Sequence, residues 1–218
     1  MRKPDSQPDA APNDILKTAY DLKSAEQARK LYRDWARTYD QDFAEAYDYR
    51  NPQLIAALFA AQAIENTPVL DVGAGTGLVG QALAAQGQGP IDALDFSPEM
   101  LAVAMEKGCY RAAIEGDLTG RLKIADDSYG GVICVGTFTH GHVGPQAIDE
   151  LIRVARPGAL FTLGVNADIY ESAGFAAKFA AVGPLIRDFE IVEQCGYGPS
   201  ASPEQRAART AVAVFRKR

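Results

Sequence analysis

The chain has few cysteines and fewer positive than negative charges. Its 218 residues include 3 cysteines, widely separated and expected in or beside strands as buried reduced thiols. Neither a disulfide framework nor a metal site is therefore predicted. Lysine and arginine together number 22 against 28 acidic residues, which gives a formal net charge of -6. A general affinity for nucleic-acid backbones is not expected from that balance.

Long apolar stretches are also missing. No run approaches the roughly 20 residues of a membrane-spanning helix, and residues 1–8 lack the apolar core of a signal peptide. We therefore expect a cytoplasmic protein without membrane segments, either a monomer or a homodimer. A hydrophobic share of 47% over this length suffices for one α/β domain with a short appendage.

Short apolar runs alternate with helical patterns over residues 67–218, the predicted main domain. This rhythm implies crossover connections and a mainly parallel, doubly wound α/β sheet. Residues 1–14 are predicted to form a mobile tail, and residues 15–66 an N-terminal helical segment. Strands are expected near 68–72, 91–95, 110–115, 130–136, 158–165, 186–194 and 210–217, and helices from about Ser24 through Tyr39, from Asn51 to about Glu65, and near 77–87, 98–108, 145–156 and 171–182.

Gly73, Gly75 and Gly77 follow the first predicted strand at alternate positions. Such a loop brings its backbone close to a ligand before a helix begins. With Asp95 about twenty residues further on, the segment also fits the dinucleotide fingerprint. Asp71 separates the two readings, because its carboxylate would repel a pyrophosphate but suits an ammonium group, directly or through water. S-adenosylmethionine is therefore the favoured ligand, and a nicotinamide-dependent reductase is a distant alternative.

At these residues the chain resembles the class I S-adenosylmethionine-dependent methyltransferases, in particular the small group that includes the Williams-Beuren region methyltransferase. The resemblance covers most of the chain and implies a seven-stranded, Rossmann-like sheet whose last strand is antiparallel. It also implies S-adenosylmethionine as the cofactor and S-adenosylhomocysteine as the product. It rests on six segments in the family's order: 32–40, 69–77, 94–100, 116–118, 131–138 and 153–158.

The methionine and ribose parts of this cofactor are expected at the ends of the first two strands, because ligands of such sheets lie at the carboxyl edge. Gly73, Gly75 and Gly77 would contact the methionine portion, and Asp71 would orient its ammonium group. Asp95 can accept hydrogen bonds from both vicinal ribose hydroxyls. The alternatives are a simple packing turn for the glycines and a helix cap or surface acid for Asp95.

The adenine is expected against the next two loops. Phe96 and Met100 offer apolar walls, Asp117 can accept from the exocyclic amine, and the backbone of Leu118 can donate. A simple turn at residues 116–117 is the alternative. Thr137, at the end of the fourth strand, completes the predicted cofactor contacts.

An aromatic face is predicted on the upstream helix. Tyr32, Trp35 and Tyr39 recur at helical spacing. The resemblance implies that this helix covers the cofactor pocket, with Trp35 and Tyr39 as contacts. Plain packing of the helix on the sheet is the alternative. A lid predicts that the segment becomes ordered when the cofactor binds.

Methyl transfer is an in-line displacement, so alignment and exclusion of water matter more than a catalytic relay. A base is needed only if the acceptor loses a proton. His140 and His142, in the loop after the fourth strand, are the candidate bases; a structural role in the loop is the alternative. As no further ligand stands at a recognisable spacing, no metal is predicted.

The acceptor is expected to be a small molecule, methylated on nitrogen, oxygen or sulfur. The fourth-strand end lacks the Asp/Asn-Pro-Pro-aromatic motif that grips a flipped base, which disfavours nucleic-acid modification. Methylation of a protein or peptide nitrogen and a non-catalytic regulatory binder remain open as alternatives. Position alone nominates further acceptor-pocket residues, which fit caps or turns equally well: Asn166, Asp168, Tyr170 and Tyr197.

Overall fold

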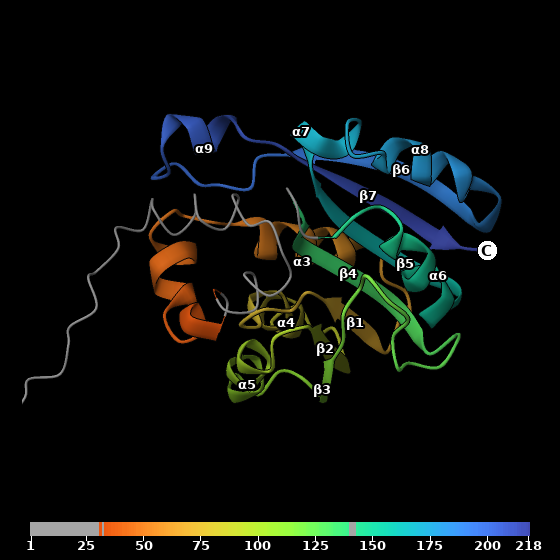
Figure 1. Cartoon of the computed structure of the whole chain (residues 1–218), viewed down its shortest axis with the longest axis horizontal. Coiled ribbons are helices and arrows are strands. Elements are labelled where there is room, and N and C mark those ends of the chain that lie inside the picture. Colours follow the sequence, from red (N-terminus) through yellow and green to blue (C-terminus); the bar gives the residue numbers. More distant parts are fainter. Residues whose placement is uncertain (1–30, 32, 140–142) are drawn as a thin grey trace, which may run out of the picture.

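The computed structural model describes residues 31, 33–139 and 143–218. Within this part of the chain the centre is a seven-stranded sheet with the order β3-β2-β1-β4-β5-β7-β6 (Figure 1). The order reverses between β1 and β4, which is where ligands of such sheets bind. The strands are β1 (Val69–Val72), β2 (Ile91–Asp95), β3 (Ala112–Glu115), β4 (Tyr129–Phe138), β5 (Ala155–Asn166), β6 (Ile186–Gln194) and β7 (Thr210–Lys217).

Strands β1 to β5 pair in parallel, and β7 is antiparallel to both of its neighbours. In β1, Val69 lies opposite Ile91 of β2 on one side and Gly131 of β4 on the other. The strands β1, β2 and β4 therefore end close together at one edge. This confirms the predicted doubly wound, mainly parallel sheet with an antiparallel last strand.

Helices cover both faces of the sheet, as crossover connections require. Apolar residues of α3 (Asn51–Gln62), α4 (Leu78–Ala84) and α5 (Pro98–Glu106) belong to one buried cluster. Residues of α6 (Ala147–Val154) and α8 (Phe175–Ala181) belong to the cluster on the other face. The fold also includes short elements: η1 (Asp40–Glu45), α7 (Ala167–Tyr170), η2 (Gly183–Leu185) and α9 (Pro203–Ala207).

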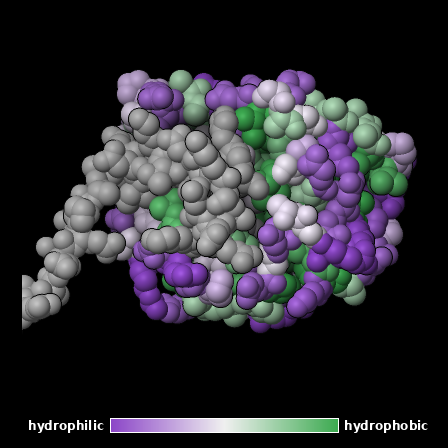
Figure 2. Space-filling view, viewed as in Figure 1, coloured by the Kyte–Doolittle hydropathy of each residue, from purple (hydrophilic) through white to green (hydrophobic). Residues whose placement is uncertain are grey.

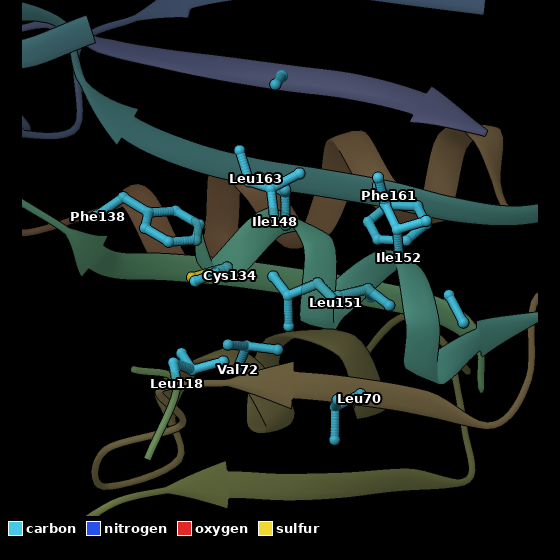
Figure 3. Packing of buried hydrophobic residues seen from close by; sticks show 14 of the residues in the cluster. Leu70, Val72, Leu118, Cys134, Phe138, Ile148, Leu151, Ile152, Phe161 and Leu163 are labelled. Atoms are coloured by element: carbon cyan, nitrogen blue, oxygen red, sulfur yellow. The ribbon is translucent and has the colours of Figure 1, made fainter. Parts of the chain in front are cut away.

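The buried faces follow from alternation along the strands. In β1, Leu70 and Val72 belong to the α6 cluster, whereas Val69 and the acid Asp71 point to the opposite face. Figure 3 shows Leu151 of α6 among the side chains of β1 and β4. Full burial of each large apolar side chain in these clusters stabilises the fold by about 1.5–3 kcal/mol. Packing on both faces therefore holds the loops at the carboxyl edge in place.

Several boundaries differ from the sequence prediction. Strand β5 begins at Ala155, three residues before its predicted start, directly after α6. The helix predicted over 171–182 is shorter in the structure, where residues 171–174 form turns and α8 begins only after Gly174, which adopts a φ of 87°. The short α7 lies before the predicted range. Helix α9 was not predicted, although Ser202 and Gln205 form a capping box at its start.

The N-terminal segment also departs from the prediction. A helix running unbroken through Tyr39 is wrong, because turns at residues 36–38 separate the helical residues 33–35 from Tyr39 and the π-helix η1. Wide π-turns are rare in a regular helix, and here tertiary contacts of Asp40 and Phe43 accompany them. The tail 1–14, the predicted helix start at Ser24 and Tyr32 lie outside the described residues.

The segment 33–50 lies beyond the carboxyl ends of the central strands (Figure 1). Hydrophilic residues gather along the lower left edge of the same view, where α5 lies (Figure 2). Among the described residues, no helix combines the length and apolar character needed to cross a bilayer.

Candidate functional site

The glycine-rich loop after β1 has a backbone that only glycine adopts readily. Gly73, Gly75 and Gly77 have φ values of 67°, 53° and 94°. A Cβ added to Gly73 would lie 1.9 Å from Oγ1 of Thr137, whereas one added to Gly75 would meet no described atom within 4 Å. The loop is thus packed against β4 at Gly73 and open at Gly75, which leaves room for a ligand against its backbone.

Thr137 joins the ends of β1 and β4, the two strands between which the strand order reverses. Its hydroxyl donates to the carbonyl oxygen of Val72 at 3.2 Å. This bond holds the end of β4 beside the end of β1. The structure therefore brings the predicted contact Thr137 next to Gly73.

Asp95 ends β2 with a carboxylate that is 7% exposed. Its Oδ2 accepts from the amide of Gly75 at 2.9 Å, and its Oδ1 accepts from the amide of Ser97 at 2.9 Å. Burial raises the pKa of this carboxyl, although both amide hydrogen bonds lower it. Asp95 is thus neither a surface acid nor the cap of α5, which is Ser97. Each oxygen keeps acceptor capacity for a ligand hydroxyl.

Asp71 is fully buried at the end of β1. Its Oδ2 accepts from the hydroxyl of Tyr110 at 2.6 Å, while its Oδ1 has no hydrogen-bond partner among the described residues. Burial is the main cause that raises the pKa of Asp71 to about 7. Buried acceptors are rarely left unpaired, so an ammonium group or a water held by one fits this oxygen. With the open backbone at Gly75, the residues present fit an adenosyl amino acid.

The predicted adenine contacts lie around the ends of β2 and β3. Phe96 is half-buried, and Met100 and Leu118 are 2% and 8% exposed. Oδ1 of Asp117 accepts from the backbone amide of Thr119 at 2.9 Å and from its hydroxyl at 2.7 Å, so this oxygen stabilises its own turn. A cavity of about 630 Å³ adjoins Leu118 on the side of α6. The structure thus contains a turn at Asp117, as the alternative interpretation of residues 116–117 predicted.

The predicted lid aromatics pack on one another. Trp35, Phe43 and Tyr47 form a buried cluster separate from the two clusters on the sheet faces, with Tyr39 packed against it. The rings of Trp35 and Tyr39 meet edge to face at 4.8 Å. Nε1 of Trp35 is buried without a hydrogen-bond partner in the described part of the chain.

One end of this segment is attached to the glycine-rich loop and to α5. Asp40 accepts from the hydroxyl of Thr76 at 2.5 Å and from the ammonium of Lys107 at 2.6 Å. An exposed ion pair of Arg33 with Glu99 at 2.9 Å lies nearby. Sequence reasoning missed Thr76 and Lys107, because their relation to Asp40 exists only in three dimensions.

The other end of the segment is attached to the loop after β6. Tyr49 and Tyr197 form an antiparallel bridge, and their rings lie 5.4 Å apart. Asp48 accepts from the hydroxyl of Ser200 at 2.7 Å. A Cβ added to Gly136, near the end of β4, would lie 3.4 Å from the hydroxyl of Tyr49. Tyr49, which was not predicted, and Tyr197 therefore line the carboxyl edge near β4.

Comparison with known proteins shows which family this part of the chain resembles. The model of a family described as a methyltransferase domain matches residues 69–158, from β1 to the start of β5. Residues 69–158 therefore belong to a class I S-adenosylmethionine-dependent methyltransferase domain. The matched segment includes the glycine-rich loop, Asp71, Asp95, Asp117 and Thr137.

Two curated relatives agree with this methyltransferase assignment. The chain is 35% identical over 153 residues to Methyltransferase-like protein 27 of Homo sapiens, covering 68% of this chain and 61% of that protein. It is 33% identical over 135 residues to the malonyl-[acyl-carrier protein] O-methyltransferase of Pectobacterium atrosepticum, covering 61% of this chain and 50% of that protein. The chain thus spans about half to three fifths of the length of these relatives.

A solved structure confirms the fold of the methyltransferase domain. The [4+2]-cyclase SpnF superposes with a TM-score of 0.64 at 16% identity, over 90% of this chain and 97% of that chain. At this identity the likeness concerns the fold alone. Because that protein is named as a cyclase, the fold does not specify the reaction.

The remaining predicted residues are the catalytic and acceptor-pocket candidates. His140 and His142 lie outside the described residues. Asn166 caps α7 by accepting from the amide of Asp168 at 2.8 Å, and Tyr170 stacks with Phe179. Asn166 and Tyr170 thus have structural partners. Within the described residues no group of three or more metal-ligating side chains comes together.

Proposed function

We propose that the protein transfers a methyl group from S-adenosylmethionine to a small-molecule acceptor by in-line displacement, leaving S-adenosylhomocysteine. The observation that carries this proposal is the fully buried Asp71, whose Oδ1 has no partner among the described residues beside the open glycine-rich loop. A cationic amino-acid group supplies the missing partner. A pyrophosphate would add negative charge beside two buried carboxylates, Asp71 and Asp95.

The donor would lie along the carboxyl edge, from β1 towards β3. Gly73, Gly75 and Gly77 would contact its methionine part, and Asp71 and Asp95 would bind its ammonium and its ribose. Around the adenine and above it we assign the contacts predicted from the sequence: Phe96, Met100, Asp117, Leu118, Thr137, Trp35 and Tyr39. When bound, the donor supplies an electrophilic methyl on a sulfonium, and the residues of this chain align it and exclude water.

The attachment of the N-terminal segment supports a small acceptor. Asp40 accepts a hydrogen bond from the glycine-rich loop, and Asp48 accepts one from the loop after β6. A segment attached at both ends leaves little access for the backbone of a folded protein. Tyr49 and Tyr197 would then form an aromatic wall on the acceptor side, near Gly136.

Within its class we place the protein in the small group that includes the Williams-Beuren region methyltransferase. Identity of 35% to Methyltransferase-like protein 27 supports this placement. The second relative is by its name an O-methyltransferase that acts on a malonyl group carried by a protein. Small acceptors with an ionisable oxygen therefore belong in the first screen.

Two measurements test the proposal. Calorimetric titration with S-adenosylhomocysteine and with NADH compares the two cofactor classes, and binding of NADH alone would refute the assignment. Incubating the protein with metabolite pools and isotopically labelled S-adenosylmethionine then seeks a labelled product. Label on peptides alone would favour protein methylation. Binding without any labelled product would favour a regulatory binder.

His140 is proposed as the base if the acceptor must lose a proton. In the sequence the residue follows the last residue of β4 by two positions. A general base contributes about 10²–10⁴-fold in rate. We expect His140→Ala to slow turnover within that range and to leave the affinity for S-adenosylhomocysteine unchanged. His142→Ala is the matched variant in the same loop. Turnover equal to that of wild type in both variants would exclude both residues as bases.

A further inference from the structure

Tyr110 forms a buried polar contact that neither the motifs nor the proposed function accounts for. The residue lies between α5 and β3 and is 8% exposed. Its hydroxyl donates to Oδ2 of Asp71 at 2.6 Å and accepts from the amide of Gly80 at 3.0 Å. Tyr110 therefore links the first turn of α4 to the acid at the end of β1.

The packing around the ring fixes the direction of this hydroxyl. A Cβ added to Gly80 would lie 2.2 Å from Cζ of Tyr110, and one added to Gly77 would lie 2.9 Å from its Cε2. Glycine in a helix costs about 0.5–1 kcal/mol relative to alanine, so Gly80 stabilises α4 less than alanine would. The absence of a side chain there allows the ring to approach the helix.

The contact determines which oxygen of Asp71 can meet a ligand. Because Oδ2 is occupied by Tyr110, Oδ1 alone remains without a partner among the described residues. A carboxylate without this bond could rotate about its χ2 angle and present either oxygen. Removing the hydroxyl would also leave the Gly80 amide without its acceptor.

We propose that Tyr110 is a positioning residue: its hydroxyl fixes Asp71 so that Oδ1 receives the ammonium group of the cofactor, directly or through water. This inference depends on the proposed function, because it assumes an adenosyl amino acid as the ligand. The contact supplies affinity for the amino-acid end only, and the adenosine end is bound elsewhere along the edge.

The ionisation of Asp71 gives the proposal a pH signature. Burial raises the pKa of Asp71 to about 7, and the Tyr110 hydrogen bond opposes that rise. The other titratable groups that interact with Asp71 are Asp95 of β2, Cys109 before Tyr110, and Cys134 of β4, none of which is a cation. An ammonium ligand prefers the carboxylate, so its affinity is full above pH 7 and falls as the pH drops through about 7.

The test compares two ligands that differ in the amino-acid portion. S-adenosylhomocysteine carries the ammonium group, and 5′-methylthioadenosine lacks it. Both are titrated calorimetrically into wild type and Tyr110→Phe between pH values of about 6 and about 8. In this range the ammonium group of a free amino acid, which is more basic than a peptide N-terminus, stays largely protonated. We expect the variant to bind S-adenosylhomocysteine about tenfold more weakly near neutral pH, with its pH midpoint moved upward. Binding of 5′-methylthioadenosine should not change.

A double-mutant cycle distinguishes positioning from general disturbance. In an Asp71→Asn background, Tyr110→Phe should have no further effect on the ratio of the two affinities. Tyr129→Phe is the matched control, because Tyr129 donates a similar buried hydrogen bond to Asp92 at 2.8 Å, away from the carboxyl edge. It should leave both affinities unchanged.

Several outcomes would overturn the inference. They are an unchanged S-adenosylhomocysteine affinity in Tyr110→Phe, an equal loss for both ligands, or a full effect of Tyr110→Phe in the Asp71→Asn background. If Tyr110→Phe does not fold, Asp71→Asn decides, since an unchanged ratio of the two affinities in that variant would mean that Asp71 does not receive the ammonium group. Failure of wild type to bind either ligand would instead refute the proposed function.

Discussion

Two buried tyrosine–aspartate pairs lie in different parts of the same sheet. At the carboxyl edge, Tyr110 donates to Asp71; towards the amino edge, Tyr129, the first residue of β4, donates to Asp92. Asp92 also accepts from Arg111 with both oxygens, at 2.9 Å and 2.6 Å. Among the described residues, no such cation is paired with Asp71, and its Oδ1 has no hydrogen-bond partner.

The difference separates an acid that stabilises the fold from one suited to a ligand. Arg111 compensates the charge of Asp92 within the chain, so this pair serves β2, β3 and β4 alone. A buried carboxylate without a cation is costly for the folded state, and such groups cluster at functional sites. The carboxyl edge thus retains a charge that a cationic ligand can neutralise.

The largest effect is expected from Asp71→Asn on stability. The folded pKa of Asp71, about 7, exceeds its unfolded value of 3.8, so the folded state binds the proton more tightly. Stability of the cofactor-free protein therefore falls as the pH rises from 3.8 to about 7, by roughly 4 kcal/mol at most. Asp71→Asn should lose this dependence and be more stable than wild type above pH 7. Urea unfolding at several pH values measures it, and identical profiles would contradict the comparison.

A smaller effect is expected from Asp95→Ala on ligand affinity. Loss of the ribose contacts should weaken binding by about 1.5–3 kcal/mol. Both S-adenosylhomocysteine and 5′-methylthioadenosine contain the ribose, so calorimetry should show equal losses for the two. This distinguishes Asp95 from Asp71, and unchanged affinities would mean that the ribose lies elsewhere.

At the other end of β2, Asp92→Ala should affect stability alone. The change leaves the buried hydroxyl of Tyr129 unpaired, whereas Arg111 is half exposed and can reach water. We expect a loss of about 1–2 kcal/mol in the free energy of unfolding and unchanged affinity for S-adenosylhomocysteine. A large loss of affinity would contradict the distinction between the two tyrosine–aspartate pairs.

The smallest effect is expected from Asp40→Asn. Asp40 is partly exposed, which limits the value of its ion pair with Lys107. We expect a loss of up to about 1 kcal/mol in cofactor affinity, seen as faster dissociation in stopped-flow measurements. Asp48→Asn is the matched control at the other end of the segment, and it should leave cofactor dissociation unchanged.

The sequence predicted the features that depend on local pattern. The mainly parallel sheet, the glycine-rich loop, and the acids Asp71 and Asp95 at strand ends follow from periodicity, spacing and family resemblance. The roles of Tyr110 and Asp40 were missed, because their partners lie 39 and 36 or more residues away in the chain. Gly80, a glycine inside a helix, was the available signal that a bulky side chain packs there.

The attachments of residues 33–50 join the two halves of the sheet. Asp40 is held by the half that contains β1 to β3, and Asp48 by the loop that follows β6. The segment therefore crosses the edge of the sheet where the strand order reverses, and separate contacts hold it on each side. We expect that breaking the contacts of Asp40 leaves those of Asp48 in place, so that the two ends of the segment can open independently of each other.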